Sequence, residues 1–362
     1  MRDDEVRVRI MIIALAIVAA LVTDGARADG PAADPQRTPS VKPVTSAPHP
    51  TAKAVPVRGR LPETPNNPPA PAEVLSRRAT EPARTWARGP FVSVQVNVNA
   101  MGNNIIGDAA NEPSIAIDPT DPSKIAIGWR QFDTIASDFR QAGVAYSQDD
   151  GQTWTFPGVL DPGQFRSDPV LGADADGNFY YYSLSTVTTA EVFKSTDGGA
   201  TWAAPVNGWG GDKEWMTVDR TSSIGQNNIY AIWNVQFSCC GNTDFTRSIN
   251  QGLSFQSPIK VPEPSMKWGT LDVGPDGTLY LAGATLDQSG HVFARSVNAK
   301  NTAQTPVFDL VTSISLGGTT SFGNPNPDGL LGQVNIATDH SAGPSSGNVY
   351  VLASVNPPNA DP

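Results

Sequence analysis

Acidic, basic and aromatic side chains recur where several strand-like segments of this sequence begin. Four such starts carry, in chain order, Asn111-Glu112, Arg166-Ser167-Asp168, Asp212-Lys213-Glu214-Trp215 and Lys267-Trp268. A further polar group, Arg130, Gln131 and Asp133 with Arg140 beyond it, follows the end of another segment. Carboxylates, guanidinium groups and tryptophan gathered in one place suit a sugar or a small anion. The alternative is a set of ion pairs that serves the fold alone.

Other combinations of reactive residue types fit their chemistry less well. Residues Gly343–Gly347 (GPSSG) match Gly-x-Ser-x-Gly, but the nucleophile elbow needs a following helix, and none is expected there. Residues Asp174–Asn178 (DADGN) resemble a calcium loop, but Ser185 stands where the bidentate glutamate should be. Of the histidines, His291 and His340 alone fall in the strand-rich region, too few for a metal cluster. We therefore expect neither a metal nor a cofactor.

The two cysteines of the chain are adjacent, Cys239 and Cys240 in QFSCCGNTDF. Two cysteines in an exported protein suggest a disulfide, which between neighbours is an eight-membered ring. A pair of free thiols is the alternative, and the sequence does not decide between them.

One octapeptide occurs twice and returns in weaker form. SQDDGQTW (Ser147–Trp154) is followed by STDGGATW (Ser195–Trp202), then by SINQGLSF (Ser248–Phe255) and SVNAKNTA (Ser296–Ala303). In such a turn the aspartate accepts backbone N–H groups, glycine supplies positive φ, and tryptophan packs against neighbouring strands. We therefore expect a structural role for Ser147, Asp149, Gly151, Thr153 and Trp154, and for Ser195, Asp197, Gly199, Thr201 and Trp202.

Upstream of each octapeptide lies a second recurring unit, an apolar strand ending in a turn and followed by an aromatic strand. Examples are EPSIAIDPTDPSKIAIGW, DPVLGADADGNFYYYS and WGTLDVGPDGTLYLAG. Alternating β-branched and aromatic residues between Asp-Gly, Asn and Pro signals favour strands over helices. Four short strands in a repeat of roughly 40–50 residues are typical of a β-propeller blade. The sequence thus predicts an all-β propeller of four-stranded blades over residues 91–362.

The octapeptide Ser-x-Asp-x-Gly-x-Thr-Trp resembles the Asp-box, or bacterial neuraminidase repeat, of the sialidase-like propeller superfamily. The resemblance covers residues 91–362 and implies six blades, whereas the sequence accounts for about five. Residues Phe91–Asn99 (FVSVQVNVN) alternate as a strand and are a candidate for the closing outer strand of the last blade. We accordingly expect a propeller that is incomplete, as in a fragment or a protein that needs a partner.

The resemblance also implies where chemistry would lie. In the superfamily the Asp-box turns are peripheral, and the starts of the inner strands surround the channel on the other face. The implied channel-face site comprises Glu112, Arg130, Asp133, Arg166, Asp168, Lys213, Glu214, Lys267 and Trp268. Sialidases use three arginines, a tyrosine nucleophile with a glutamate, and an aspartate. Here Asn-Glu-Pro-Ser occupies the place of their Arg-Ile-Pro motif, and no complete arginine set can be assigned.

The N-terminal ninety residues have a different character. Ile10–Val22 is a short apolar run flanked by arginines and followed by Ala26-Arg27-Ala28, which indicates a secretory signal peptide over residues 1–28. Residues 29–90 are rich in proline and lack periodicity, which predicts a disordered linker. We expect a secreted, periplasmic or cell-surface protein without a membrane span after signal cleavage.

The net charge of the whole chain is −10. Residues 29–90 hold nine Lys and Arg against five Asp and Glu, so the acidity belongs to the propeller region. This balance argues against nucleic acid as a partner. Two functions remain: a propeller that binds a glycan or an extracellular protein through its channel face without catalysis, and an exo-α-sialidase or related glycoside hydrolase.

Overall fold

The computed structural model describes residues 80–82, 85–105, 107–134, 137, 139–321, 332–356 and 358, all of which belong to one compact unit of the chain. The expected signal peptide and nearly all of the expected linker lie outside these residues. The described part is built from strands, with a single short 3-10 helix, η1 (Val235–Phe237). Within it, no helix has the length and apolar character needed to cross a membrane.

The first blade shows the pattern of the others. Strands β5 (Ala109–Ile117), β6 (Ile125–Phe132), β7 (Gln141–Ser147) and β8 (Thr155–Leu160) form an antiparallel sheet in chain order. The register of β5 on β6 shifts between Asn111 and Ser114, so a bulge interrupts the start of the inner strand. Such a bulge redirects the side chains beside it, because the regular alternation of the strand is broken there.

The second and fourth blades repeat this four-stranded order. The second contains β9 (Ser167–Ala173), β10 (Phe179–Leu184), β11 (Ala190–Ser195) and β12 (Val206–Asn207). The fourth contains β16 (Met266–Val273), β17 (Leu279–Thr285), β18 (His291–Ser296) and β19 (Leu310–Ile314). In both blades the register shifts near the start of the inner strand, as it does in the first.

The third and fifth blades are shorter than the four strands that the sequence predicts. The third contains β13 (Trp215–Val218), β14 (Ile229–Ile232) and β15 (Phe245–Ser248), and a single bridge from Phe245 to Ile259 stands for its outer strand. The fifth contains β21 (Asn335–Thr338) and β22 (Val349–Leu352), with β20 (Thr319–Thr320) and β23 (Val355–Asn356) paired nearby in the chain. The expectation of a β-propeller with about five visible blades is confirmed.

The strands that precede the first blade differ from the expectation. Strand β3 (Phe91–Val94) pairs with β2 (Thr85–Arg88) in a hairpin, and β1 (Thr80–Pro82) pairs with β4 (Asn103–Ile105). The assignment of Phe91–Asn99 as the outer strand of the last blade is therefore wrong. A turn at Gly89-Pro90 lets β3 pair with the strand beside it in sequence, and closing so short a loop costs little entropy. Ordered strands thus begin inside the range 29–90 that was expected to be a linker.

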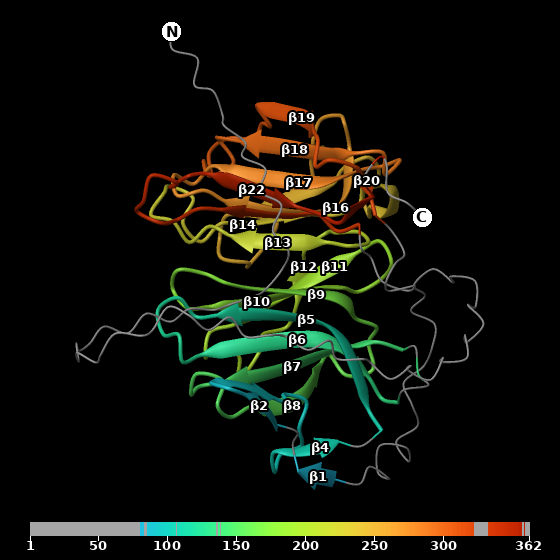
Figure 1. Cartoon of the computed structure of the whole chain (residues 1–362), viewed down its shortest axis with the longest axis vertical. Helices are drawn as coiled ribbons and strands as arrows, with labels where there is room; N and C mark the ends of the chain where they lie inside the picture. The colour runs from blue at the N-terminus through green and yellow to red at the C-terminus, as the bar shows by residue number, and fades with distance from the viewer. Residues whose placement is uncertain are drawn as a thin grey trace, which may run out of the picture. The chain divides into compact units, whose positions relative to one another are not determined.

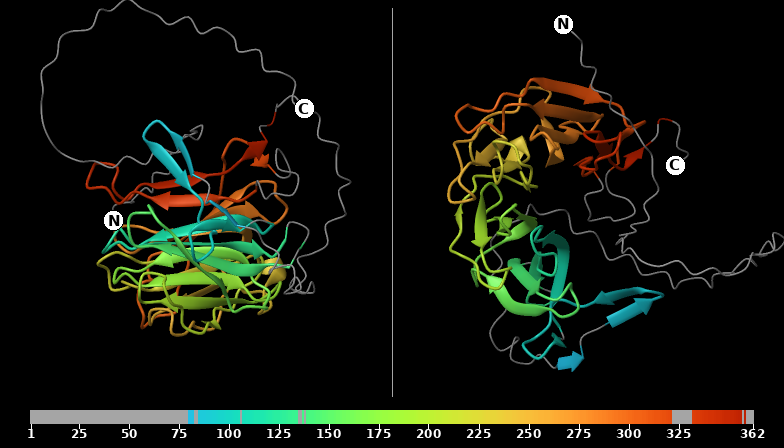
Figure 2. Two further views of the ribbon diagram at one scale, coloured as in Figure 1. Left: turned by 90° about the horizontal axis from the view of Figure 1, so that it is seen from below. Right: turned by 90° about the vertical axis from the view of Figure 1, so that its left-hand side faces the viewer.

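The inner strands β5, β9, β13, β16 and β21 follow one another around a common centre (Figures 1 and 2). Three consecutive tyrosines on β10 seal neighbouring blades because alternate side chains point to opposite faces. Tyr181 donates to the carbonyl oxygens of Trp129 and Gly143 in the first blade, each at 3.3 Å. Tyr180 donates to Asp174 Oδ2 at 2.7 Å, and its hydroxyl oxygen lies 3.2 Å from the carbonyl oxygen of Gln251 in the third blade. All three tyrosines are fully buried and serve packing.

The Asp-box turns share one hydrogen-bonding pattern. In the first, Asp149 Oδ1 accepts from the Ser147 hydroxyl and the Thr153 N–H, each at 2.8 Å, and the Gly151 N–H donates to Ser147 Oγ at 2.9 Å. The second turn, Ser195–Trp202, repeats these bonds within 0.1 Å. The third keeps them with Asn250 in place of aspartate, because its amide oxygen accepts from Ser248 and from the Ser254 N–H.

The antiparallel order of each blade separates these turns from the starts of the inner strands. Each Asp-box follows the third strand of its blade, whereas Glu112, Asp168 and Lys213 lie at or near the start of the first. Since the first and third strands run in the same direction, the start of one and the end of the other lie at opposite ends of the blade. Asp149 and Glu112 therefore belong to different faces of the propeller.

Candidate functional site

Four inner strands have a residue in the left-handed backbone region at or close to their start. Glu112, Asp168, Lys213 and Trp268 have φ values of 50°, 48°, 57° and 52°. Each stands six positions before the residue that opens the turn after its inner strand: Asp118, Asp174, Asp219 and Gly274. A left-handed residue other than glycine costs free energy, and such residues gather at sites where the surrounding structure imposes them. One conformation repeated in four blades points to a built feature of the channel mouth.

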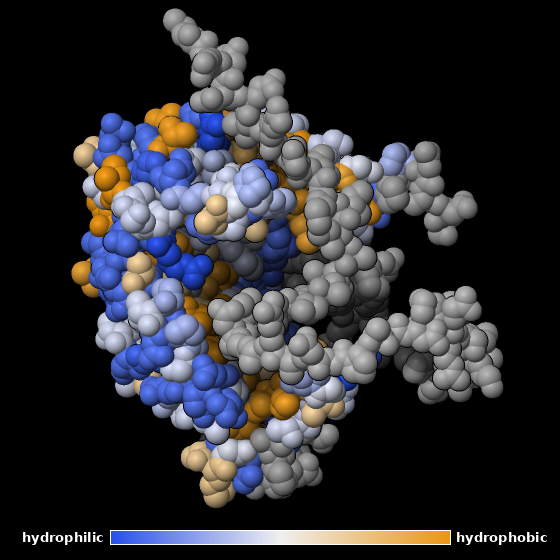
Figure 3. Space-filling view, turned by 60° about the vertical axis from the view of Figure 1, so that its left-hand side comes forward, coloured by the Kyte–Doolittle hydropathy of each residue, from blue (hydrophilic) through white to orange (hydrophobic). Residues whose placement is uncertain are grey.

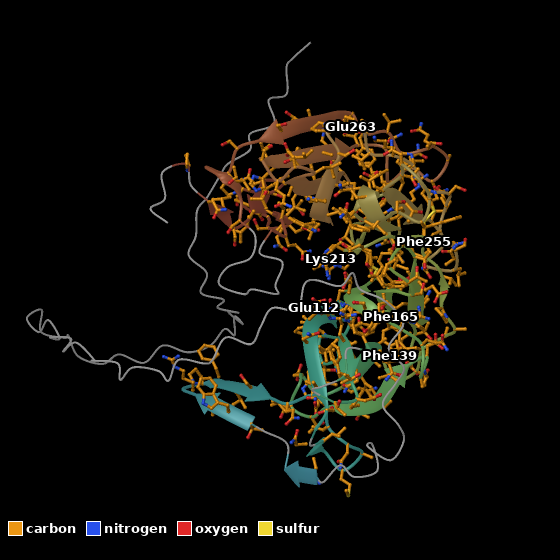
Figure 4. The ribbon with its side chains drawn as sticks, turned by 90° about the vertical axis from the view of Figure 1, so that its right-hand side faces the viewer. Glu112, Phe139, Phe165, Lys213, Phe255 and Glu263 are labelled. Carbon is orange, nitrogen blue, oxygen red and sulfur yellow. A yellow bond between two sulfur atoms is a disulfide. The ribbon has the colours of Figure 1, made fainter. Side chains whose placement is uncertain are left out.

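A cavity of about 320 Å³ lies at this mouth, a size in the range of small-molecule sites. It is lined by Glu112, Pro113, Ser114, Asp168, Pro169, Val170, Lys213, Glu214, Trp215 and Gln333. The first, second, third and fifth blades contribute these residues. Gln333, which begins the fifth-blade repeat, stands six positions before Asp339. Figure 4 shows Glu112 and Lys213 on the inner side of the curved array of blades. Figure 3 views the molecule from nearly the opposite side, where hydrophilic and hydrophobic residues surround a central hollow.

Asp168 and Lys213 join the second blade to the third across the cavity wall. Their Oδ2 and Nζ atoms are 2.9 Å apart, and the backbone N–H of Lys213 donates to the same oxygen at 3.3 Å. The Ser167 hydroxyl donates to the other oxygen at 2.9 Å. Burial raises the pKa of Asp168, but the charge and hydrogen bond of Lys213, with Arg130 and Ser167, outweigh it and the net shift is downward. Asp168 is therefore ionised at neutral pH.

Glu112 has a cationic partner of its own. Its Oε1 lies 2.6 Å from Nη2 of Arg130, which follows on β6, and Arg130 Nε also donates to Asn111 Oδ1 at 2.8 Å. Both partners of the Arg130 side chain lie on β5, so Arg130 ties β6 to the bulged start of the inner strand. Two of the three carboxyl groups at the cavity accordingly carry a basic partner.

Glu214 is the third carboxyl group, and its situation is different. Its side chain is 1% exposed, and neither carboxyl oxygen has a hydrogen-bond partner among the described residues. Burial raises the pKa of Glu214 well above its ordinary value, and the negative charge of Asp168 raises it further. Buried polar atoms are almost always paired in folded proteins, so the Glu214 carboxyl group stands apart from the other polar groups of the cavity wall.

Not all of the expected site residues reach the cavity. Arg166 is 3% exposed and lies between Asp161 and Glu191, with 2.6 Å to an oxygen of each, while its guanidinium covers the ring of Phe193. Asp133 is buried and accepts from the Gln141 side chain.

Lys267 and Trp268 also lie elsewhere. The Lys267 ammonium lies over the Trp268 ring at 4.4 Å. Trp268 packs in the core with residues of the fifth blade. Arg166, Asp133, Lys267 and Trp268 therefore do not line the cavity, while Glu112, Asp168, Lys213 and Glu214 do, with Arg130 holding Glu112.

Ser114 and Gln333 line the cavity although neither is among the expected site residues, and Trp215 joins its neighbours Lys213 and Glu214 there. A sequence signal for Gln333 exists in the six-residue spacing to Asp339, which repeats the spacing from Glu112 to Asp118. Ser114 carries no such signal, because its hydroxyl accepts the N–H of Leu171 from the next blade, a contact that the sequence alone does not show.

Cys239 and Cys240 are joined by a disulfide in the loop that follows β14. This loop contacts the segment that leads into Lys213 and Glu214. The Cys239 N–H donates to the Gly210 carbonyl at 3.1 Å, and the Asn234 N–H donates to the Asp212 carbonyl at 3.1 Å. Its own shape is held by Trp233 Nε1, which donates to Ser238 Oγ and to the Thr243 carbonyl. The disulfide loop thus supports the backbone behind one wall of the cavity.

No group of three or more histidine, cysteine, aspartate or glutamate side chains is placed to hold a metal ion in the described residues. The polar groups of the cavity are carboxyls, one ammonium, a hydroxyl and an amide. Such a set can bind a ligand through hydrogen bonds and charge, and Glu214 can donate or accept a proton.

The blades and their Asp-box turns define a propeller with the sialidase-like fold. No family model matches the sequence, and no curated protein matches it. Among solved structures, a protein of unknown function from Dyadobacter fermentans DSM 18053 is 16% identical, with a TM-score of 0.37, over 57% of this chain and 72% of that one.

Two structures of enzymes are similar at the same level. The Hadza microbial sialidase Hz136 is 12% identical with a TM-score of 0.41, over 62% of this chain and 49% of that chain. The exo-β-1,3-galactanase 1,3Gal43A from Clostridium thermocellum is 14% identical with a TM-score of 0.38, over 58% and 51%. The chain thus spans about half the length of each enzyme. The fold assignment itself rests on the sheet order and the turns described above.

Proposed function

We propose that this protein is an exported glycan-binding propeller and that its ligand occupies the cavity formed by Glu112, Asp168, Lys213, Glu214, Trp215 and Gln333. The observation that carries the proposal is the buried, unpaired carboxyl group of Glu214 in the cavity wall. A sugar presents hydroxyl groups that pair with such atoms, and its C–H faces pack on tryptophan and proline. The size of the cavity supports a glycan over an extended protein surface, because about 320 Å³ holds a small ligand.

Binding of the exported full chain to a panel of immobilised neutral, acidic and amine-bearing oligosaccharides tests this proposal. Gln333→Trp places a large ring in the cavity and should abolish binding while the thermal unfolding midpoint stays unchanged. Gln148→Trp is the matched control, because Gln148 is exposed in the Asp-box turn at the other end of the first blade. Binding that survives Gln333→Trp, or that Gln148→Trp removes, places the ligand elsewhere and contradicts the proposal.

Glycoside hydrolysis is a second candidate, favoured by the opposite pKa shifts of two neighbouring carboxyl groups. The shift is upward for Glu214 and downward for Asp168, and a protonated acid beside an ionised carboxylate is the pairing that acid–base catalysis uses. A sialidase in particular has less support. Among the described residues no arginine and no tyrosine lines the cavity, and Tyr180, Tyr181 and Tyr182 are buried.

Release of methylumbelliferone from sialoside and galactoside conjugates separates the two candidates. A glycan-binding propeller without catalytic activity should release no methylumbelliferone above the rate of spontaneous hydrolysis. Release that disappears in Glu214→Gln while sugar binding persists favours the hydrolase, since the isosteric amide cannot supply a proton.

A further inference from the structure

The charges around the cavity are unevenly matched. Glu112 lies 2.6 Å from Arg130, and Asp168 lies 2.9 Å from Lys213, so each of these carboxylates has a basic partner. Glu214 has none at hydrogen-bonding distance among the described residues, and it lies next to Lys213 in sequence, whose ammonium is turned to Asp168. Among the described residues, Glu214 is therefore the cavity carboxyl group without a cation at hydrogen-bonding distance, and an ionised Glu214 would need one from a ligand.

A ligand group that matches Glu214 must satisfy two buried oxygen atoms. A hydroxyl group donates one hydrogen bond and brings no charge, so it meets only part of this need. An ammonium group donates up to three hydrogen bonds and brings the missing positive charge. An unpaired buried carboxylate is costly, whereas a paired and hydrogen-bonded one is stable, so the ammonium group is the better match.

The remaining walls suit the rest of an amino sugar. Trp215, Pro113, Pro169 and Val170 offer apolar surface for the ring carbons, and Gln333 and Ser114 offer polar atoms for hydroxyl groups. A tryptophan also favours a nearby cation through its ring face. The net charge of −10 attracts cationic ligands over longer distances as well.

We propose that the channel mouth selects glycans that carry free amino groups, such as glucosamine oligomers, with an ammonium group seated on Glu214 between the second and third blades. This selection rests on the proposed glycan-binding function and names its ligand class. In the empty cavity Glu214 carries a proton, and on binding a ligand that is already protonated it passes that proton to the solvent. The bound state then pairs a carboxylate with an ammonium, and no other reactant takes part.

The test compares a glucosamine tetramer with its N-acetylated counterpart, which has the same sugar rings but no free amine. Isothermal titration calorimetry at pH 6 should show the free-amine tetramer binding roughly 10–100-fold more tightly, the worth of a hydrogen bond to a charged partner. The enthalpy should depend on the ionisation enthalpy of the buffer with a slope of about one proton released, as the linkage between binding and ionisation requires.

Two variants make the result specific to Glu214. Glu214→Gln should bring the affinities for the two tetramers together and abolish proton release. Glu263→Gln should change neither, because Glu263 is an exposed partner of Lys260 outside the cavity and lies well away from Glu112 and Lys213 in Figure 4. Its chemical change is the same, so it controls for the replacement of a carboxyl group by an amide.

The possible outcomes distinguish failure of the proposed amine selectivity from failure of the proposed glycan-binding function. Equal affinities of the wild-type chain for both tetramers overturn the amine selection and leave glycan binding standing. A preference that persists in Glu214→Gln overturns it as well, because the ammonium group then binds elsewhere. If neither tetramer binds and no member of the oligosaccharide panel binds, both the selection and the proposed function fail.

Discussion

Asp168 and Lys213 belong to different blades and are joined twice, through the Lys213 ammonium at 2.9 Å and the Lys213 backbone N–H at 3.3 Å, both to Asp168 Oδ2. Both residues have left-handed backbones, so neither side chain points where a regular strand would direct it. This pairing fixes the charge that Glu214 experiences, because Asp168 raises the pKa of Glu214 while Lys213 lowers it. The ionisation of the cavity is thus a property of the junction between two blades.

Asp168→Asn tests this coupling. The substitution removes a negative charge that raises the pKa of Glu214 and releases the positive charge of Lys213, so Glu214 should ionise at lower pH. The pH at which glucosamine tetramer binding ceases to release a proton should therefore fall, which calorimetry in two buffers over a pH series measures. An unchanged pH profile, in a variant that retains the circular dichroism spectrum of the wild type, would show that the two carboxyl groups do not interact.

The raised pKa of Glu214 should also make the stability of the ligand-free protein depend on pH. The unfolded chain loses the Glu214 proton near the ordinary pKa of 4.5, whereas the folded chain keeps it to a higher pH. The unfolded state then binds fewer protons, so the contribution of Glu214 to the free energy of unfolding falls as pH rises above 4.5.

Urea unfolding at pH 5 and pH 7 measures this contribution. The wild type should lose more stability between the two pH values than Glu214→Gln, which cannot ionise. Equal changes in the two proteins would mean that Glu214 has an ordinary pKa.

The disulfide loop should affect binding more than folding. Its backbone donates to Gly210 and Asp212, directly before Lys213 and Glu214. We expect a variant with both Cys239→Ser and Cys240→Ser to keep the thermal unfolding midpoint within a few degrees and to bind the glucosamine tetramer more weakly. Reductant should weaken binding by the wild type in the same way and leave the double variant unaffected. A double variant that binds like the wild type would restrict the loop to packing.

Substitutions in the Asp-box turns should affect folding more than binding, the opposite of what is expected for the disulfide loop. Ser195 is buried, and its hydroxyl accepts the Gly199 N–H at 3.0 Å and donates to Asp197 at 2.8 Å. Ser195→Ala leaves the buried Gly199 N–H without its partner and removes one of the hydrogen bonds to Asp197, which should cost about 1–3 kcal/mol of unfolding free energy. Tetramer binding by the folded protein should be unchanged.

The first turn offers a graded pair of variants. Asp149→Asn, which copies Asn250 of the third turn, should destabilise less than Asp149→Ala because the amide oxygen still accepts hydrogen bonds. The pKa of Asp149 is lowered first by its hydrogen bond with the Thr153 hydroxyl. Its stabilising effect is therefore complete above the ordinary value of 3.8 and is lost as pH falls below it. Reduced binding without reduced stability in either variant would mean that the two faces are reversed.

The repeat in the sequence predicted the blades because each of the three turns needs particular residues at particular places: a serine hydroxyl, a carboxylate or amide oxygen, and a glycine with positive φ. Gly151 and Gly199, with φ of 77° and 87°, fill the last requirement. The resemblance to sialidase-like propellers predicts Glu112, Asp168 and Lys213 at the channel mouth, and each stands six residues before the turn that follows its inner strand.

The orientation of neighbouring side chains could not be predicted in this way. Arg166 precedes Asp168 by two residues, yet it turns into the second blade to meet Glu191, because the left-handed residue breaks the alternation of the strand. The unpaired state of Glu214 depends on where Lys213 turns, and Lys213 turns to a carboxylate from another blade. Contacts of this kind depend on how the blades pack, which the local sequence does not encode.

The central claim, that ligands bind at the inner-strand face, can be tested with the tryptophan indole groups as probes. The chain has eight tryptophans, of which Trp215 lines the cavity, while Trp154 and Trp202 belong to Asp-box turns at the other end of their blades. In a 15N-tryptophan spectrum, with Trp215 assigned from Trp215→Phe, the glucosamine tetramer should shift the Trp215 indole signal and leave those of Trp154 and Trp202 in place. Shifts at Trp154 or Trp202 with an unmoved Trp215 would contradict the account.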